Sequence, residues 1–138
     1  MMSRHVEVLM NQSSLKLIYV FGDGDKIREK VERLLFLNEL SALKEFSRKL
    51  TDAVEQMQKI AERTMEADVI IAGGDDFLFS TSNANYRREH IESLSLIFEQ
   101  LTGCTISFGV GPTMEIAYLN LRRAKVLDAV RIMEIRDE

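Results

Sequence analysis

The stretch Asp68-Val69-Ile70-Ile71-Ala72-Gly73-Gly74-Asp75-Asp76-Phe77-Leu78-Phe79 places a Gly-Gly-Asp-Asp core between two short apolar runs. The run before the core is β-branched and the run after it is aromatic, so both are typical of strands. Gly73 and Gly74 can adopt the positive φ angles of a tight hairpin turn. The pattern therefore predicts a β-hairpin that presents Asp75 and Asp76 together at one edge of a sheet.

Two neighbouring carboxylates repel each other, and a divalent cation relieves that repulsion. The alternative is a surface hairpin with two solvated acids, because Gly-Asp turns are common. A second acidic stretch, Gly22-Asp23-Gly24-Asp25, follows the apolar run 15–21 and is expected to be another turn. Two acidic turns that each end an apolar strand favour a shared site.

Length and composition indicate a globular chain. It has 138 residues, 46% of them hydrophobic, which is enough for one domain with a real core. The net charge of −4 predicts no stable nucleic-acid binding, although a nucleotide held through a metal is compatible with it. Cys104 is the only cysteine, which excludes an internal disulfide and favours a reducing, cytoplasmic location. We expect Cys104 to be buried and inert, and no apolar run is long enough to predict a membrane span.

The chain in order predicts alternating strands and helices behind a lead-in over residues 1–14. The expected strands are residues 15–21, the two arms of the hairpin, 105–110 and 129–135. The expected helices are residues 26–37, 40–66, 86–101 and 114–127. Asp25, residues 82–85 and Thr113 are predicted to cap helix N-termini, and Gly103 is predicted to end a helix. Residues 15–138 are expected to form a single domain.

The predicted order is β-α-α-β-β-α-β-α-β, which contains the ferredoxin-like β-α-β-β-α-β arrangement and indicates an α+β fold with helices packed on the sheet. In that arrangement the first strand lies antiparallel to the strand after the hairpin, so Asp23 is expected beside the Gly74–Asp76 turn. Alternation along the strand could turn Asp76 to the other face. The converging carboxylates are hard oxygen ligands, which predicts Mg²⁺ or Mn²⁺ and a role in phosphoryl transfer.

Four motifs occur in an order that resembles a known family. They are Asp23-Gly24-Asp25, Gly73-Gly74-Asp75-Asp76, Ser107-Phe108-Gly109-Val110-Gly111 and Arg122-Arg123-Ala124-Lys125. They resemble the palm domain shared by GGDEF diguanylate cyclases and the polymerase-like large subunit of type III CRISPR complexes. The short length is most similar to the stand-alone minimal CRISPR polymerase (mCpol) domain. The resemblance covers about residues 15–135, and the Gly-Gly-Asp-Asp hairpin is its most specific part.

The resemblance implies a palm nucleotidyltransferase that joins NTPs, releases pyrophosphate and makes a cyclic di- or oligonucleotide messenger. The implied setting is antiviral defence, with a downstream cyclic-nucleotide effector protein. Asp23, Asp75 and Asp76 would be the catalytic acids. The metal ligands would be these three acids and the Gly24 carbonyl. The implied substrate-binding residues are Gly73, Gly74 and Lys125, although Lys125 taken alone is equally typical of a solvated lysine.

Two further expectations concern the substrate and the assembly. The first comes from a residue that differs from the diguanylate cyclase pattern, and the second from the presence of a single Gly-Gly-Asp-Asp hairpin. Diguanylate cyclases carry an Asn that reads guanine eight residues after the first metal Asp, and here Val31 stands at that position. This loss favours ATP and a cyclic diadenylate product. In the resembling families two palms face each other, which implies a homodimer. A non-catalytic nucleotide-binding palm that acts as a sensor or subunit is the main alternative, and a plain interaction domain is another. The residues specify neither the 2′ or 3′ linkage nor the ring size.

Overall fold

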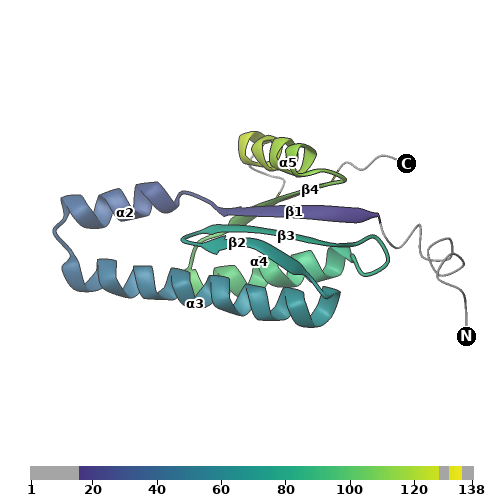
Figure 1. The fold of residues 1–138 in the computed structure, drawn as a ribbon. Coiled ribbons are helices and arrows are strands. Elements are labelled where there is room, and N and C mark those ends of the chain that lie inside the picture. Colours follow the sequence, from purple (N-terminus) through teal and green to yellow (C-terminus); the bar gives the residue numbers. More distant parts are fainter. Residues whose placement is uncertain (1–15, 128–130, 135–138) are drawn as a thin grey trace, which may run out of the picture.

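The computed structural model describes residues 16–127 and 131–134, and its centre is one five-stranded sheet (Figure 1). The strands lie in the order β2-β3-β1-β4-β5. Their bounds are β1 (Leu17–Gly24), β2 (Asp68–Gly73), β3 (Asp76–Ser82), β4 (Ile106–Gly111) and β5 (Ile132–Glu134). The strand β1 is antiparallel to both β3 and β4, and β5 runs parallel to β4. The predicted α+β palm order is confirmed. The predicted lead-in over residues 1–14 and residues 129, 130 and 135 of the last predicted strand lie outside the described residues.

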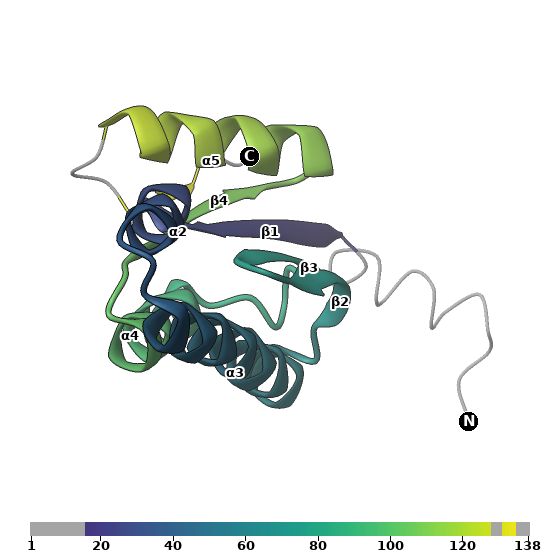
Figure 2. The same ribbon diagram turned by 90° about the vertical axis from the view of Figure 1, so that its left-hand side faces the viewer.

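Helices cover the two faces of the sheet unequally. The helices are α2 (Ile27–Phe36), α3 (Leu40–Met65), α4 (Arg88–Thr102) and α5 (Met114–Leu127). As Figures 1 and 2 show, α3 and α4 lie together on one face, and α5 lies alone on the other, above β4 and β1. None of the helices in the described part of the chain is both long and apolar enough to cross a membrane.

The main core lies between the sheet and the α3–α4 layer. The long helix α3 places apolar residues every three or four positions, which gives it one buried stripe. That stripe packs against α4 and against the inward residues of the central strands. The fully buried large side chains of this layer include Met57, Met65, Ile91, Leu94, Phe98, Val20, Phe77, Phe79 and Phe108. Each contributes about 1.5–3 kcal/mol by leaving water, so this layer holds the strand order in place.

Helical spacing in the sequence predicts Ile91, Leu94, Ile97 and Leu101 as the buried side of α4, and the end of this stripe is wrong by one position. The helix α4 buries Ile91, Leu94 and Phe98, whereas the predicted core residue Leu101 is 36% exposed. Positions 91, 94, 98 and 102 follow the 3.6-residue period, so Thr102 takes the last inward place. Its hydroxyl donates a hydrogen bond of 2.8 Å to the carbonyl of Phe98, which satisfies the buried polar group.

The predicted caps have different outcomes. Thr113 accepts a hydrogen bond from the backbone N–H of Ile116 at 3.1 Å, as predicted. Gly103 ends α4 with a φ of 75°, also as predicted. The predicted caps at residues 82–85 are wrong, because these residues form a turn of their own and α4 begins only at Arg88, after an extended Arg87. Asp25 is not a cap either, because Lys26 occupies the N-cap position of α2 and the Asp25 carboxylate is bound elsewhere.

The second predicted acidic turn is part of a strand. The strand β1 extends to Gly24, because it lies between β3 and β4 and pairs with both as far as that residue. The hairpin turn itself is as short as predicted, with Gly74 and Asp75 between paired Gly73 and Asp76. Only Gly74 has a positive φ, 57°, while Gly73 is the last residue of β2.

The helix α5 packs unusually close to the sheet. A methyl group at Gly109 on β4 would overlap the backbone of Ala117 and Leu121 on α5. The buried amide of Asn120 donates a hydrogen bond of 2.8 Å to the carbonyl of Val110, which also joins α5 to β4. The close approach fixes the distance between α5 and the sheet. It therefore determines which groups of the sheet the side chains near the C-terminal end of α5 can contact.

Gly109→Ala tests this packing. We expect a loss of about 1–3 kcal/mol or more in the free energy of unfolding, because the added methyl meets backbone and not a flexible side chain. Urea denaturation followed by circular dichroism measures the change. Gly73→Ala is the matched control, since a methyl there meets nothing within 4 Å. Equal stability of the two variants would contradict the close packing.

Candidate metal and nucleotide site

The strand register brings three carboxylates together. Asp23 near the end of β1 lies directly opposite Asp76 at the start of β3. Asp75 belongs to the hairpin turn, which is tied to β1 by a hydrogen bond of 3.2 Å from the Gly24 N–H to the Asp75 carbonyl. Carboxylate oxygens of the three residues all lie within 4.8 Å of one another. The structure thus places the three acids in one cluster, which we call the acidic rim.

Asp76 points to the same side of the sheet as Asp23. The two residues are a direct cross-strand pair, and such pairs share a face. The expected alternative, in which strand alternation turns Asp76 away, is therefore wrong. Asp75 reaches the same place because it lies in the turn, where the alternation of the strand no longer applies.

The acidic rim carries more negative charge than it readily holds. Partial burial, a hydrogen bond with Asp23 and the charges of Asp23 and Asp76 together raise the pKa of Asp75 to about 7. Burial and the neighbouring Asp23 also raise the pKa of Asp76, against a smaller opposing effect of Lys125. Carboxyl groups in this state are stabilised by an added cation.

A second network adjoins the rim and is centred on Asp25. Its carboxylate accepts hydrogen bonds of 2.8 Å from the hydroxyls of Thr105 and Ser107, and Lys125 Nζ lies 2.9 Å from Oδ1. Burial alone would raise the pKa of Asp25, but the hydrogen bonds from Lys125, Ser107 and Thr105 lower it overall. The sequence prediction missed this role. The only signal was the pair of hydroxyl residues at the start of β4, since that strand borders β1.

Lys125 links the two networks. Its Nζ donates a hydrogen bond of 2.7 Å to the Gly24 carbonyl and lies 3.2 Å from Asp23 Oδ2. The side chain is 19% exposed, so it is mostly removed from solvent. The alternative of a solvated lysine is therefore wrong.

The residues of the rim fit a hard divalent cation. The donor set consists of carboxylate oxygens, with the Gly24 carbonyl beside them, and such ligands suit Mg²⁺ or Mn²⁺. Gly73 and Gly74 are exposed, and a methyl group on either would meet nothing within 4 Å. The hairpin therefore leaves open space beside the rim.

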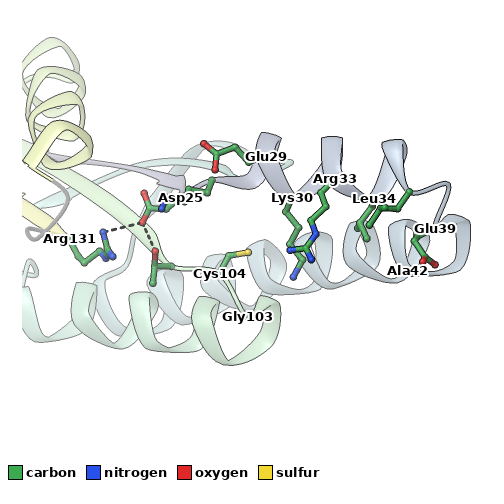
Figure 3. A pocket seen from close by; sticks show the side chains of 13 residues that line it. Asp25, Glu29, Lys30, Arg33, Leu34, Glu39, Ala42, Gly103, Cys104 and Arg131 are labelled. Atoms are coloured by element: carbon green, nitrogen blue, oxygen red, sulfur yellow. Dashed lines mark hydrogen bonds and ion pairs between the residues drawn. The ribbon is translucent and has the colours of Figure 1, made fainter.

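A cleft of about 800 Å³ begins at Asp25 and continues between α2, the start of α3 and the loop after α4 (Figure 3). Its cationic side chains are Lys26, Lys30, Arg33 and Arg131. Cys104 also lines the cleft and is half-buried, which corrects the prediction of a buried thiol; it lies in the loop between α4 and β4, where the cleft opens.

Val31 packs against the hydrophobic core and does not line the cleft. Lys30 and Leu34 on the same helix do line it. The comparison of Val31 with a guanine-reading Asn, which favours ATP, therefore stays a prediction.

Comparison with known proteins identifies the family. The family model of the minimal CRISPR polymerase domain, mCpol, matches residues 19–135. The chain belongs to this family. A search of curated proteins found no match.

Solved structures share the fold at low sequence identity. The Csm1–Csm4 cassette in complex with cA4 aligns with a TM-score of 0.62 and 18% identity over 88% of this chain and 21% of that one. The GGDEF domain of a Pseudomonas aeruginosa protein aligns with 0.54 and 9% over 94% and 89%. The adenylyl cyclase CyaB from the same organism aligns with 0.51 and 17% over 69% and 54%. The chain thus spans about a fifth of the matched Csm1–Csm4 chain and about half of the matched CyaB chain, and the likeness shows a shared fold.

The charge of the rim predicts a pH-dependent stability. The raised pKa of Asp75 stabilises the fold fully below about pH 4, and that contribution is lost as pH rises through about 7. In EDTA, the melting temperature of the wild type should therefore fall more steeply between pH 5 and 8 than that of Asp75→Asn, which cannot ionise. Differential scanning fluorimetry measures both slopes. Equal slopes would contradict the expected link between the ionisation of Asp75 and the stability of the fold. Adding Mg²⁺ should flatten the wild-type slope.

Proposed function

We propose that this mCpol-family chain is a metal-dependent nucleotidyltransferase that makes a cyclic di- or oligonucleotide second messenger for antiviral defence. The favoured substrate is ATP and the favoured product is cyclic diadenylate. The observation that carries the proposal is the convergence of Asp23, Asp75 and Asp76 at one rim of a cyclase-like palm. A domain with a purely structural role has no need of acids whose pKa is raised by partial burial and by their mutual repulsion.

The residues of the rim have assigned roles in this proposal. Asp23, Asp75 and Asp76 hold Mg²⁺ or Mn²⁺, with the Gly24 carbonyl as a further ligand. Divalent cations supply two effects there: they lower the pKa of an attacking hydroxyl and neutralise charge on the leaving oxygens. The open hairpin at Gly73 and Gly74 gives phosphate access to the acids.

The reaction forms one phosphodiester bond at a time. A ribose hydroxyl oxygen of one nucleotide bonds to the α-phosphorus of another, and the bond from that phosphorus to the bridging oxygen breaks. Pyrophosphate leaves and the hydroxyl proton passes to solvent. A second transfer of the same kind closes the ring of a dinucleotide. The protein contributes position and electrostatic stabilisation, which are the main sources of rate in such transfers.

The cleft beside Asp25 offers a place for the nucleoside part of the substrate. Its volume of about 800 Å³ is within the range of ligand pockets. Apolar Leu34 and Leu37 are among its lining residues, and Arg131 lies 3.7 Å from the Asp25 carboxylate (Figure 3). No Asn or Gln is among the lining residues. Because Glu29 and Glu39 could accept hydrogen bonds from guanine, the base preference needs a direct comparison of ATP with GTP.

The first test is turnover with each NTP in the presence of Mg²⁺ or Mn²⁺, with products resolved by chromatography and mass spectrometry. We expect cyclic adenylate product, and a loss of about 10²–10³-fold or more in Asp23→Ala and Asp75→Ala. Asp68→Ala is the matched control, because Asp68 is an exposed acid at the far end of the same hairpin. Full activity of Asp75→Ala would overturn the mechanism. Nucleotide binding without any product would favour the sensor alternative.

Assembly is part of the same proposal. Each chain brings one hairpin and hence one rim, so we propose a homodimer in which two rims face each other, each with its nucleotide. An apolar tip supports such a contact: Leu35, Phe36, Leu37 and Leu40 are 58–87% exposed. The tip lies where α2 and the start of α3 extend beyond the end of the sheet at which β1 ends (Figure 1). Exposed apolar clusters of this kind are typical of interaction sites.

A mixing experiment tests the dimer. A fixed amount of wild type is assayed with increasing amounts of Asp75→Ala protein, and its specific activity should fall as mixed dimers form. Asp75→Ala combined with Phe36→Ser is the control, because a protein with a weakened tip should inhibit less. Wild-type activity that is independent of added Asp75→Ala would mean that one chain completes both transfers.

A further inference from the structure

Lys125 makes contact with oxygens that the proposed metal site also uses. Its ammonium lies within 2.7–3.2 Å of three oxygens from consecutive residues: Asp23 Oδ2, the Gly24 carbonyl and Asp25 Oδ1. The first two belong to the proposed metal ligands, and the third does not. The lysine therefore binds on one side of the rim, through two oxygens that the cation would also use and through Asp25, which Arg131 also approaches to 3.7 Å.

The two remaining acids of the rim have no such partner. Among the described residues, neither Asp75 nor Asp76 forms a salt bridge, although carboxylate oxygens of both lie within 4.8 Å of Asp23. A divalent cation is thus attracted to their side of the rim. When it reaches Asp23 and the Gly24 carbonyl, it meets an ammonium of the same sign on the same oxygens, and like charges at such distances repel strongly.

Asp25 remains a partner for the ammonium when the other contacts are lost. Its carboxylate is fixed by the hydroxyls of Thr105 and Ser107, so it keeps its position when Lys125 leaves Asp23. The long lysine stem lies near the C-terminal end of α5, whose height above β4 is fixed by the contact at Gly109. The head group can therefore change partners while the helix stays in place.

We propose that Lys125 is an internal cation that competes with the divalent metal for Asp23 and the Gly24 carbonyl. Metal binding removes the ammonium from Asp23 and the Gly24 carbonyl and leaves it on Asp25. There it can also contact the phosphates of the incoming nucleotide. The proposal rests on the metal site of the proposed function and adds an order to it: the metal releases the lysine that the nucleotide then meets. Removing Lys125 should thus change the two affinities in opposite directions.

The test measures Mn²⁺ affinity of the full chain by electron paramagnetic resonance, without nucleotide. Lys125→Met keeps the length of the stem and removes the charge. We expect its Mn²⁺ dissociation constant to be about tenfold lower than that of the wild type, the size of effect that one lost ion-pair or hydrogen-bond contact produces. Lys125→Arg, which keeps a cation, should stay near the wild type, and Asp75→Asn should bind Mn²⁺ far more weakly.

Lys26→Met is the control for general charge effects. Lys26 is an exposed lysine two residues after Gly24, so its loss removes the same charge near the rim without removing a contact with Asp23. We expect a change of less than about twofold in Mn²⁺ affinity there. An equal gain in Lys26→Met and Lys125→Met would overturn the competition.

A second readout uses an ATP analogue with a methylene group between the α- and β-phosphates, titrated at saturating Mn²⁺. Lys125→Met should bind it about tenfold more weakly than the wild type, while binding Mn²⁺ more tightly. Unchanged or weaker Mn²⁺ binding in a folded Lys125→Met protein would show that the lysine only supports the rim. A wild type that binds no Mn²⁺ would overturn the metal site and the competition together. Tight Mn²⁺ binding without product would overturn the enzyme proposal alone.

Discussion

The pairing register of β1 determines the candidate site. This strand lies in the middle of the sheet, with Asp23 opposite Asp76 on one side and opposite Ser107 on the other. A shift of one residue would turn every side chain of a strand to the other face and separate the acids. The buried residues of β1, such as Val20, prevent that shift, because they would leave the core. The same apolar pattern that drives folding therefore also positions the carboxylates.

The packing of α5 connects the fold to the charge of the site. Gly109 allows α5 to approach β4 closely, and the approach carries Lys125 to Gly24, 101 residues away in sequence. The ammonium then contacts three consecutive residues, Asp23 and Gly24 at the end of β1 and Asp25 directly after it. The close packing at Gly109 thus contributes to the position of the Lys125 ammonium at the rim.

The sequence predicted what local pattern and strand order determine. The apolar stripe of α3, the hairpin and the meeting of Asp23 with Asp75 follow from periodicity, turn chemistry and the ferredoxin-like order. The role of Asp25 did not follow, since its partners Thr105 and Ser107 are 80 and 82 residues away and tertiary packing alone selects them over a helix cap. The comparison of Val31 with a guanine-reading Asn stays a prediction, because which side of α2 a bound base would meet depends on how that helix packs.

The charge at the rim is balanced on one side and not on the other. Asp23 and Asp25 share a lysine, whereas Asp75 and Asp76 keep raised pKa values and form no salt bridge within the described part of the chain. Repulsion of this kind lowers stability, and a fold gains nothing from it unless a ligand relieves it. The acids without a salt bridge belong to the hairpin, whose glycines are exposed, so an added cation could relieve their repulsion there. This arrangement supports the proposed cation site.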